Sequence, residues 1–262
     1  MKTDTYSDFH MHSHFSDGSA AIDTMAQHAV NIGLSQISIT DHMPLPFATR
    51  YAMTANALDQ YTSTIATARQ TFAGTLQIKM GMEIEFLPEL RHWIWTLVSR
   101  QGDRDSCWDS LIASIHHLPV GDAFHLVNGS PLEITPLLEH YNYDGKALCT
   151  EYYRILQEAY STGWFDIAGH LDVIKKHNSP TPFFDESSAW YRSLLLDTLA
   201  SIKENNMIME INTAGFNHPT GQQYPSAWII KEAVAMGIDI VLSSDSHSPG
   251  TLGQYFAKFA VV

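Results

Sequence analysis

Residues 6–18, YSDFHMHSHFSDG, begin as a short β-rich run and continue into three histidines at alternate positions. His10 and His12 lie at the end of the expected strand Tyr6–His10, and side chains two apart on a strand point to the same side. Two imidazoles that converge from one strand are typical of a transition-metal site. An isolated pair of this kind is more often found on a surface, so the metal interpretation depends on the rest of the sequence.

The alternation of a β-rich run with a longer helical segment recurs along the chain. The other expected strands are Gln36–Thr40, Leu76–Glu83, Ser110–His116, Trp164–Gly169, Met207–Asn212 and Ile238–Ser243. The expected helices are Ala20–Ile32, Ala55–Phe72, Pro88–Arg100, Leu148–Tyr160, Ser188–Asn205 and Ser226–Met236. This alternation predicts an α/β fold with a parallel sheet. We expect one domain over residues 1–262, with an irregular excursion around 118–147, where glycines and prolines are scattered without a period.

A polar residue stands at or just past the carboxyl end of every expected strand. These residues are His10, Asp41, Glu83, His116, His170, Asn212 and Asp245. An open doubly wound sheet concentrates its site at one switch point, whereas a (β/α) barrel assembles its site on the whole carboxyl face. The pattern therefore predicts a closed seven-stranded (β/α)7 barrel, similar to a TIM barrel, with its site at the carboxyl ends of the strands.

Composition restricts the classes of partner. The 15 basic and 28 acidic residues give a net charge of -13, which repels polyanions and disfavours extended nucleic-acid binding. No apolar run reaches the ~18 residues of a membrane span, and the N-terminus lacks the apolar core of a signal peptide. Two cysteines form no disulfide framework, so we expect a cytoplasmic protein. The oligomeric state is not predicted.

Two motifs offer alternatives between neighbouring residues. In GMEIEF (81–86), Glu83 and Glu85 are both candidates for a carboxylate that bridges two cations, and Glu83 is preferred because it lies nearest the strand end. In SIHH (114–117), His116 and His117 face opposite ways. We expect His116 to enter the site and His117 to lie outside it.

Further candidates follow other strands. Asp245 and His247 in SSDSH repeat the two-residue spacing on the last strand, and His170 follows the small Gly169. In TDHMP (40–44), His42 adds an imidazole, and Asp41 is expected to orient a ligand histidine. Asp17 is either a metal ligand or a turn residue ahead of Gly18.

Taken in order, these motifs resemble the polymerase-and-histidinol-phosphatase (PHP) superfamily, and within it the bacterial monofunctional histidinol-phosphate phosphatases. The matching segments are DFHMHSHFSDG, TDHMPLP, GMEIEF, SIHH, AGHLDVIKK, NTAG with the later YP, and SSDSH, from residue 7 to 247. The resemblance implies a distorted seven-stranded barrel. It also implies a metal-dependent hydrolase of L-histidinol phosphate in histidine biosynthesis.

The resemblance implies nine metal ligands at three positions, with Glu83 shared by the first two. The first position would be held by His10, His12, Glu83 and Asp245, the second by Glu83, His116 and His170, and the third by Asp17, His42 and His247. Two to three divalent ions are expected, and the mixed donors do not select among zinc, iron and manganese. Glu83 and Asp245 are the expected catalytic residues, although a metal-bound water is an alternative proton donor to the leaving alcohol.

The sequence departs from the family at the expected phosphate contacts. Family phosphatases carry an arginine a few residues past the AGH histidine, where this chain has Lys175 and Lys176. They also carry one after the NxxG motif, where Asn217 and His218 stand. Arginine grips phosphate through two parallel bonds, whereas lysine is a point charge. The remaining candidates for contact with a small phosphorylated substrate are His14, Arg50 and Lys175. Each is also typical of an ordinary loop or surface residue, and for Arg50 we prefer that interpretation.

Three rival functions remain open. A nucleotide or phosphodiester could be hydrolysed by the same metals. An amidohydrolase also begins with HxH, but that family often has a carboxylated lysine after the fourth strand, where this chain has His116 and His117. A non-catalytic metal-binding barrel would be expected to have lost ligands, and all nine candidates are present.

Overall fold

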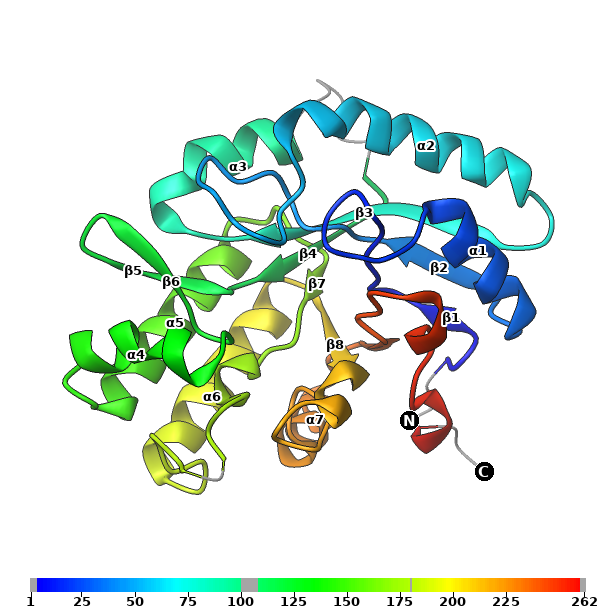
Figure 1. Cartoon of the computed structure of the whole chain (residues 1–262). Coiled ribbons are helices and arrows are strands. Elements are labelled where there is room, and N and C mark those ends of the chain that lie inside the picture. The colour runs from blue at the N-terminus through cyan, green and yellow to red at the C-terminus, as the bar shows by residue number, and fades with distance from the viewer. Residues whose placement is uncertain (1–3, 100–107, 180, 260–262) are drawn as a thin grey trace.

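The computed structural model describes residues 4–99, 108–179 and 181–259, and its centre is a sheet of seven parallel strands (Figure 1). Their spatial order follows the chain: β1 (Ser7–Asp8), β2 (Gln36–Ile39), β3 (Gln77–Glu85), β4 (Ser110–Ser114), β7 (Ile167–Ala168), β8 (Ile208–Asn212) and β9 (Ile240–Ser243). Each of the seven expected strands is present. Because all seven run parallel, their carboxyl ends meet on one face, as the positions of the polar residues predicted.

The sheet curves until its first and last strands meet. The backbone N–H of Phe9 donates to Leu242 at 3.4 Å, and that of His12 donates to Ser246 at 2.8 Å. Met11 and Ser246 form an isolated parallel bridge beyond the strand ends. Figure 1 shows the C-terminal segment lying beside β1. The predicted TIM-like barrel is confirmed, and it is nearly closed.

The helices lie where the sequence predicted them. They are α1 (Ile22–Asn31), α2 (Leu58–Thr71), α3 (Arg91–Val98), α5 (Gly145–Ser161), α6 (Ala189–Glu204) and α7 (Ala227–Ala235). The predicted helix Pro88–Arg100 ends at Val98, and Arg100 lies outside the described residues. In the described part of the chain, no helix combines the length and apolar character needed to cross a membrane.

The excursion around 118–147 is regular, so the prediction of irregular structure is wrong. It contains the antiparallel hairpin β5 (His117–Val120) and β6 (Ala123–Leu126), followed by α4 (Pro131–His140). Gly121 has a φ of +60° in the hairpin turn, and Pro131 stands in the first helical turn, where its missing N–H costs nothing. The glycine and proline that suggested irregular structure are therefore part of a turn and a helix start.

Tyr61 of α2 contacts the carboxyl end of β2 and the middle of β3. Its fully buried hydroxyl lies 3.0 Å from the carbonyl of Ile39 and 2.8 Å from that of Gly81. It also accepts the N–H of Asp41 at 3.3 Å. One phenol thus joins α2 to the end of β2 and to β3 two residues before Glu83.

We predict that Tyr61→Phe lowers the free energy of unfolding by about 1–3 kcal/mol, because buried polar groups of the backbone lose their partner. Urea denaturation measures this change. Tyr143→Phe, at a side chain that is 64% exposed, is the matched control and should leave stability unchanged. Equal stability of Tyr61→Phe and the unaltered protein would contradict the role given to this hydroxyl.

Candidate metal centre

Glu83, at the carboxyl end of β3, lies at the centre of the histidine cluster and is only 1% exposed. Its Oε2 lies 2.8 Å from His42 Nδ1 and 3.3 Å from His10 Nε2. Its Oε1 lies 2.9 Å from His170 Nε2 and 3.3 Å from His116 Nε2. Burial raises the pKa of Glu83, but His42, His116 and His10 outweigh it and hold the pKa well below its usual range. The carboxylate is therefore ionised.

Asp17 faces a second group of imidazoles. Its Oδ1 lies 3.3 Å from His247 Nε2 and 3.8 Å from both His42 Nε2 and His12 Nδ1. Burial raises the pKa of Asp17, but these three histidines outweigh it and lower the pKa to about 2. A Cβ on the next residue, Gly18, would stand 2.5 Å from the His12 carbonyl oxygen, so only glycine lets this turn pass so close. Asp17 is thus both a turn residue and a member of the cluster.

Asp245 joins the first and last strands at the centre of the cluster. Its Oδ1 lies 3.1 Å from His12 Nε2 and 3.7 Å from His10 Nε2, and its Oδ2 accepts from Asn212 Nδ2 at 3.0 Å. Its φ of +50° is the left-handed region that non-glycine residues rarely adopt. Such strain persists where surrounding contacts enforce it and is frequent at functional sites.

These side chains fit a divalent cation by two criteria. Three groups hold potential ligand atoms within 4.8 Å of one another: His12, Asp17, His42 and His247; His10, His12 and Glu83; and His42, Glu83 and His116. Buried His10 Nε2 has no hydrogen-bond partner among the described residues, and it faces Glu83 Oε2 at 3.3 Å. A cation would satisfy both atoms, and mixed imidazole and carboxylate donors suit zinc, iron or manganese.

Glu85, the alternative that the sequence left aside, supports His116 and His117. It accepts their backbone N–H groups at 2.8 and 3.0 Å, and its Oε2 lies 2.9 Å from His116 Nδ1. His116 therefore turns Nε2 towards Glu83, while His117 Nδ1 lies 3.0 Å from the Tyr51 hydroxyl. The predicted division between the two adjacent histidines agrees with these contacts.

Glu210 on β8 was missed by the sequence argument. Fully buried, it lies 2.8 Å from His10 Nδ1 and accepts the N–H of His170 at 3.1 Å and the Nδ2 amide of Asn212 at 2.7 Å. A carboxylate on the far nitrogen of an imidazole fixes its tautomer and direction. The available signal was its position two residues before Asn212, on the same side of the strand.

Asp41 does not orient a histidine, so that prediction is wrong. Its carboxylate accepts the N–H groups of Ser13 and Ser16 at 2.8 and 3.1 Å and both serine hydroxyls, at 2.8 and 2.6 Å. Asp41 is fully buried beneath the loop that leads to Asp17. Its contribution is to hold that loop over the barrel mouth.

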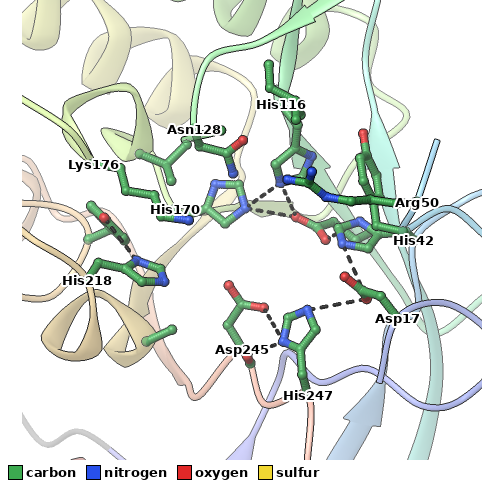
Figure 2. Close-up of a pocket in the computed structure, with 17 residues that line it drawn as sticks. Asp17, His42, Arg50, His116, Asn128, His170, Lys176, His218, Asp245 and His247 are labelled. Carbon is green, nitrogen blue, oxygen red and sulfur yellow. Dashed lines mark hydrogen bonds and ion pairs between the residues drawn. The ribbon is translucent and has the colours of Figure 1, made fainter. Parts of the chain in front are cut away.

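A cavity of about 340 Å³ opens above the cluster, and Figure 2 shows the side chains that line it. Among the predicted phosphate contacts, Arg50 lines this cavity, although its guanidinium also pairs with Glu133 at 2.6 Å. His14 does not line it: its side chain is exposed and stacks on Phe15. The prediction for His14 is therefore wrong, because the third alternate histidine lies beyond the strand.

Lys175 also fails as a phosphate contact. It is fully buried, with Nζ 2.7 Å from Asp172 Oδ2 and hydrogen-bonded to Ser226 Oγ. The neighbouring Lys176 lines the cavity instead, together with His218. Both stand at the two places where the sequence departs from the family arginines.

The barrel and the cluster at its carboxyl face define a TIM-like barrel with a candidate metal centre. Residues 8–214 match the model of the PHP domain, so the chain belongs to the PHP domain family. The fold is similar to that of the HisK protein of Listeria monocytogenes, with a TM-score of 0.83 over 97% of this chain and 99% of that one, at 22% identity.

Other similar proteins carry related names. A Deinococcus radiodurans protein named "Probable histidinol-phosphatase" is 32% identical over 88% of this chain and 82% of its own. The Bacillus subtilis histidinol-phosphatase is 26% identical over 96% and 97%. The structure of the Lactococcus lactis histidinol phosphate phosphatase, complexed with zinc, L-histidinol and phosphate, has a TM-score of 0.75 at 22% identity and covers 97% of this chain and 91% of that one.

The contact between Glu85 and His116 makes the stability of the metal-free protein depend on pH. Burial raises the pKa of Glu85, but His116 and His117 lower it below 4.5, so its stabilising effect is present above pH 4.5 and lost in acid. Burial lowers the pKa of His116, but Glu83 and Glu85 raise it to about 10, so its effect is present below pH 6.5 and lost as pH rises through 10.

We therefore predict that Glu85→Gln destabilises the chelator-treated protein most between pH 4.5 and 6.5. The difference in free energy of unfolding should shrink on both sides of this window, as measured by urea denaturation across pH. Glu89→Gln, at an exposed position, is the control. A Glu85→Gln difference that stays constant with pH would show that the ion pair is not its cause.

Proposed function

We propose that the protein is a metal-dependent phosphatase that hydrolyses L-histidinol phosphate to L-histidinol and phosphate. The observation that carries this proposal is the convergence of imidazoles and carboxylates on Glu83 beneath a cavity that Arg50 and Lys176 also line. The named relatives support the choice of substrate, because this chain aligns with 82% and 97% of their length. A small phosphate ester fits a cavity of about 340 Å³.

We propose two to three divalent ions on the nine predicted ligands. Glu83, with each oxygen close to two imidazoles, would be the carboxylate shared by two of these ions. Zinc in the Lactococcus lactis structure supports zinc as one of the metals. Such ions, when bound, withdraw charge from phosphoryl oxygens and lower the pKa of a water molecule. The chain itself holds the ligands rigid through Glu85 and Glu210 and keeps Glu83 ionised.

We propose that Asp245 transfers a proton from the attacking water to the leaving alcohol. Burial raises its pKa, but His10, His12 and His247 lower it well below its usual range, so the group is a carboxylate at neutral pH. In that form it accepts a proton from the attacking water and can pass it to the leaving alcohol. Its side chain is 16% exposed, and it lines the cavity where the ester would lie.

A nucleoside monophosphate is the main alternative substrate, since the same cluster would act on its phosphate. Two of the other rivals are weaker. No lysine lies at the end of β4, where His116 contacts the cluster, so the bridge of an amidohydrolase is missing there. Each of the nine candidate ligands lies close to another, and the cavity beside them is also lined by Arg50 and Lys176, two cations that metal storage alone does not require.

The substrate prediction is tested with a panel of phosphate esters on the metal-loaded protein. L-histidinol phosphate should have a kcat/KM at least about tenfold above those of nucleoside monophosphates, because about 1.4 kcal/mol of differential transition-state binding gives that ratio. A higher kcat/KM for any nucleotide would overturn the choice of substrate while keeping the phosphatase.

The bridging role of Glu83 predicts that Glu83→Gln lowers kcat by at least about a hundredfold and reduces bound metal, since an amide cannot give an anionic oxygen to each of two cations. Elemental analysis and initial rates measure both effects. Glu89→Gln again serves as the exposed control. A Glu83→Gln protein that retains its metals and its rate would exclude the bridge.

A further inference from the structure

Two consecutive lysines point in different directions at the turn after β7. Lys175 ends the 3₁₀ helix Val173–Lys175 and is fully buried against Asp172. The same Asp172 Oδ2 accepts hydrogen bonds from the backbone N–H and the hydroxyl of Ser226, at 2.9 and 3.0 Å. This buried ion pair joins the segment after β7 to the segment after β8. The next residue, Lys176, is directed to the cavity.

The segment after β8 brings His218 to the same side. Tyr224 exchanges both backbone hydrogen bonds with Asn212, at 2.7 and 2.9 Å, and its ring lies 5.6 Å from Lys175 Nζ. The Tyr224 hydroxyl lies 3.1 Å from His218 Nδ1. This contact occupies one nitrogen of the imidazole and leaves Nε2 for the cavity. Figure 2 shows His218 and Lys176 on the opposite side from Asp17.

The protonation states favour donation into the cavity. Burial and the charge of Lys176 lower the pKa of His218 to about 4, so its ring is neutral at pH 7. Burial raises the pKa of Tyr224, which keeps its proton. A phenol that donates to Nδ1 selects the tautomer with the hydrogen on Nε2. In this tautomer, one of the two that the 3.1 Å contact allows, His218 is a neutral hydrogen-bond donor on the cavity wall.

Lys176 supplies a cation beside this donor. Among the residues that the structure describes, no carboxylate pairs with its ammonium within 4 Å, whereas Arg50, the other lysine or arginine of the cavity, is paired with Glu133. Burial and Arg50 lower the pKa of Lys176, while Asp245 raises it. A half-buried ammonium without an anion is costly, and an incoming anion removes that cost.

We propose that Lys176 Nζ and His218 Nε2 together bind the phosphoryl oxygens of the substrate, on the side of the cavity away from Asp17. This inference rests on the proposed phosphatase function. The pair offers one charged and one neutral donor, held by the Asp172–Lys175 ion pair and by Tyr224. Because both contacts go to the phosphoryl group, their contribution is the same whichever alcohol is esterified.

The test measures the binding of inorganic phosphate to the metal-loaded protein by calorimetry, and KM for L-histidinol phosphate and p-nitrophenyl phosphate. Lys176→Met and His218→Ala should each weaken phosphate binding and raise both KM values by about tenfold to a hundredfold, as expected for a lost hydrogen bond to a charged group. Lys176→Arg should restore most of the affinity. Metal content should be unchanged in all variants.

Lys146→Met, at an exposed position on α5, is the matched lysine control and should bind phosphate normally. Phosphate affinity in Lys176→Met within twofold of the unaltered protein would overturn the inference, even if both hydrolyse the ester. If the unaltered protein leaves L-histidinol phosphate intact but binds phosphate in a Lys176-dependent way, the inference is supported and only the proposed substrate fails. A large effect on p-nitrophenyl phosphate alone would contradict a contact with the phosphoryl group.

Discussion

A carboxylate in the interior of a protein is tolerated only with charged or hydrogen-bonding partners around it, since its desolvation costs several kcal/mol. Glu83 finds these partners in the imidazoles of His10, His42, His116 and His170, which follow four other strands. No local segment could bring them together. They meet because the parallel sheet curves until the carboxyl ends of its strands point at one centre. The contacts between Glu83 and the four imidazoles therefore depend on the closure of the barrel, and they determine the chemistry of the site.

Around this centre, a second set of carboxylates determines which way each ring faces. Glu85 and Glu210 take the Nδ1 atoms of His116 and His10 and also accept backbone N–H groups from neighbouring strands. The ring positions are thereby tied to the backbone of the barrel. In the metal-free protein, Glu83 and Glu85 raise the pKa of His116, so this ring is protonated at neutral pH. A bound cation would replace the proton on His116 Nε2, which faces Glu83, while the hydrogen on Nδ1 stays with Glu85.

The seven strands could be predicted from sequence because each apolar run ends in a polar residue. Even β7, with only Ile167 and Ala168 paired, is followed by a polar residue, His170. The direction of a side chain could not. Lys175 and Lys176 are adjacent and chemically identical, yet one is buried and one lines the cavity. The partners of Asp41 and Glu210 could not be predicted either. The positions of these two residues on their strands are visible in the sequence, but their partners come from other segments.

The contacts among the residues around Glu83 differ from those of Lys176 and His218. This difference explains how the chain can keep its candidate ligands while it departs from the family arginines. Glu83 has four imidazole partners, which follow four other strands, and loss of this residue or of several partners would leave buried charges unpaired. Lys176 and His218 instead lie on the segments that follow β7 and β8, each aimed by its own neighbours. A segment of this kind can exchange one donor for another without disturbing the barrel. Variation in phosphate recognition is therefore expected on these segments and not at the strand ends.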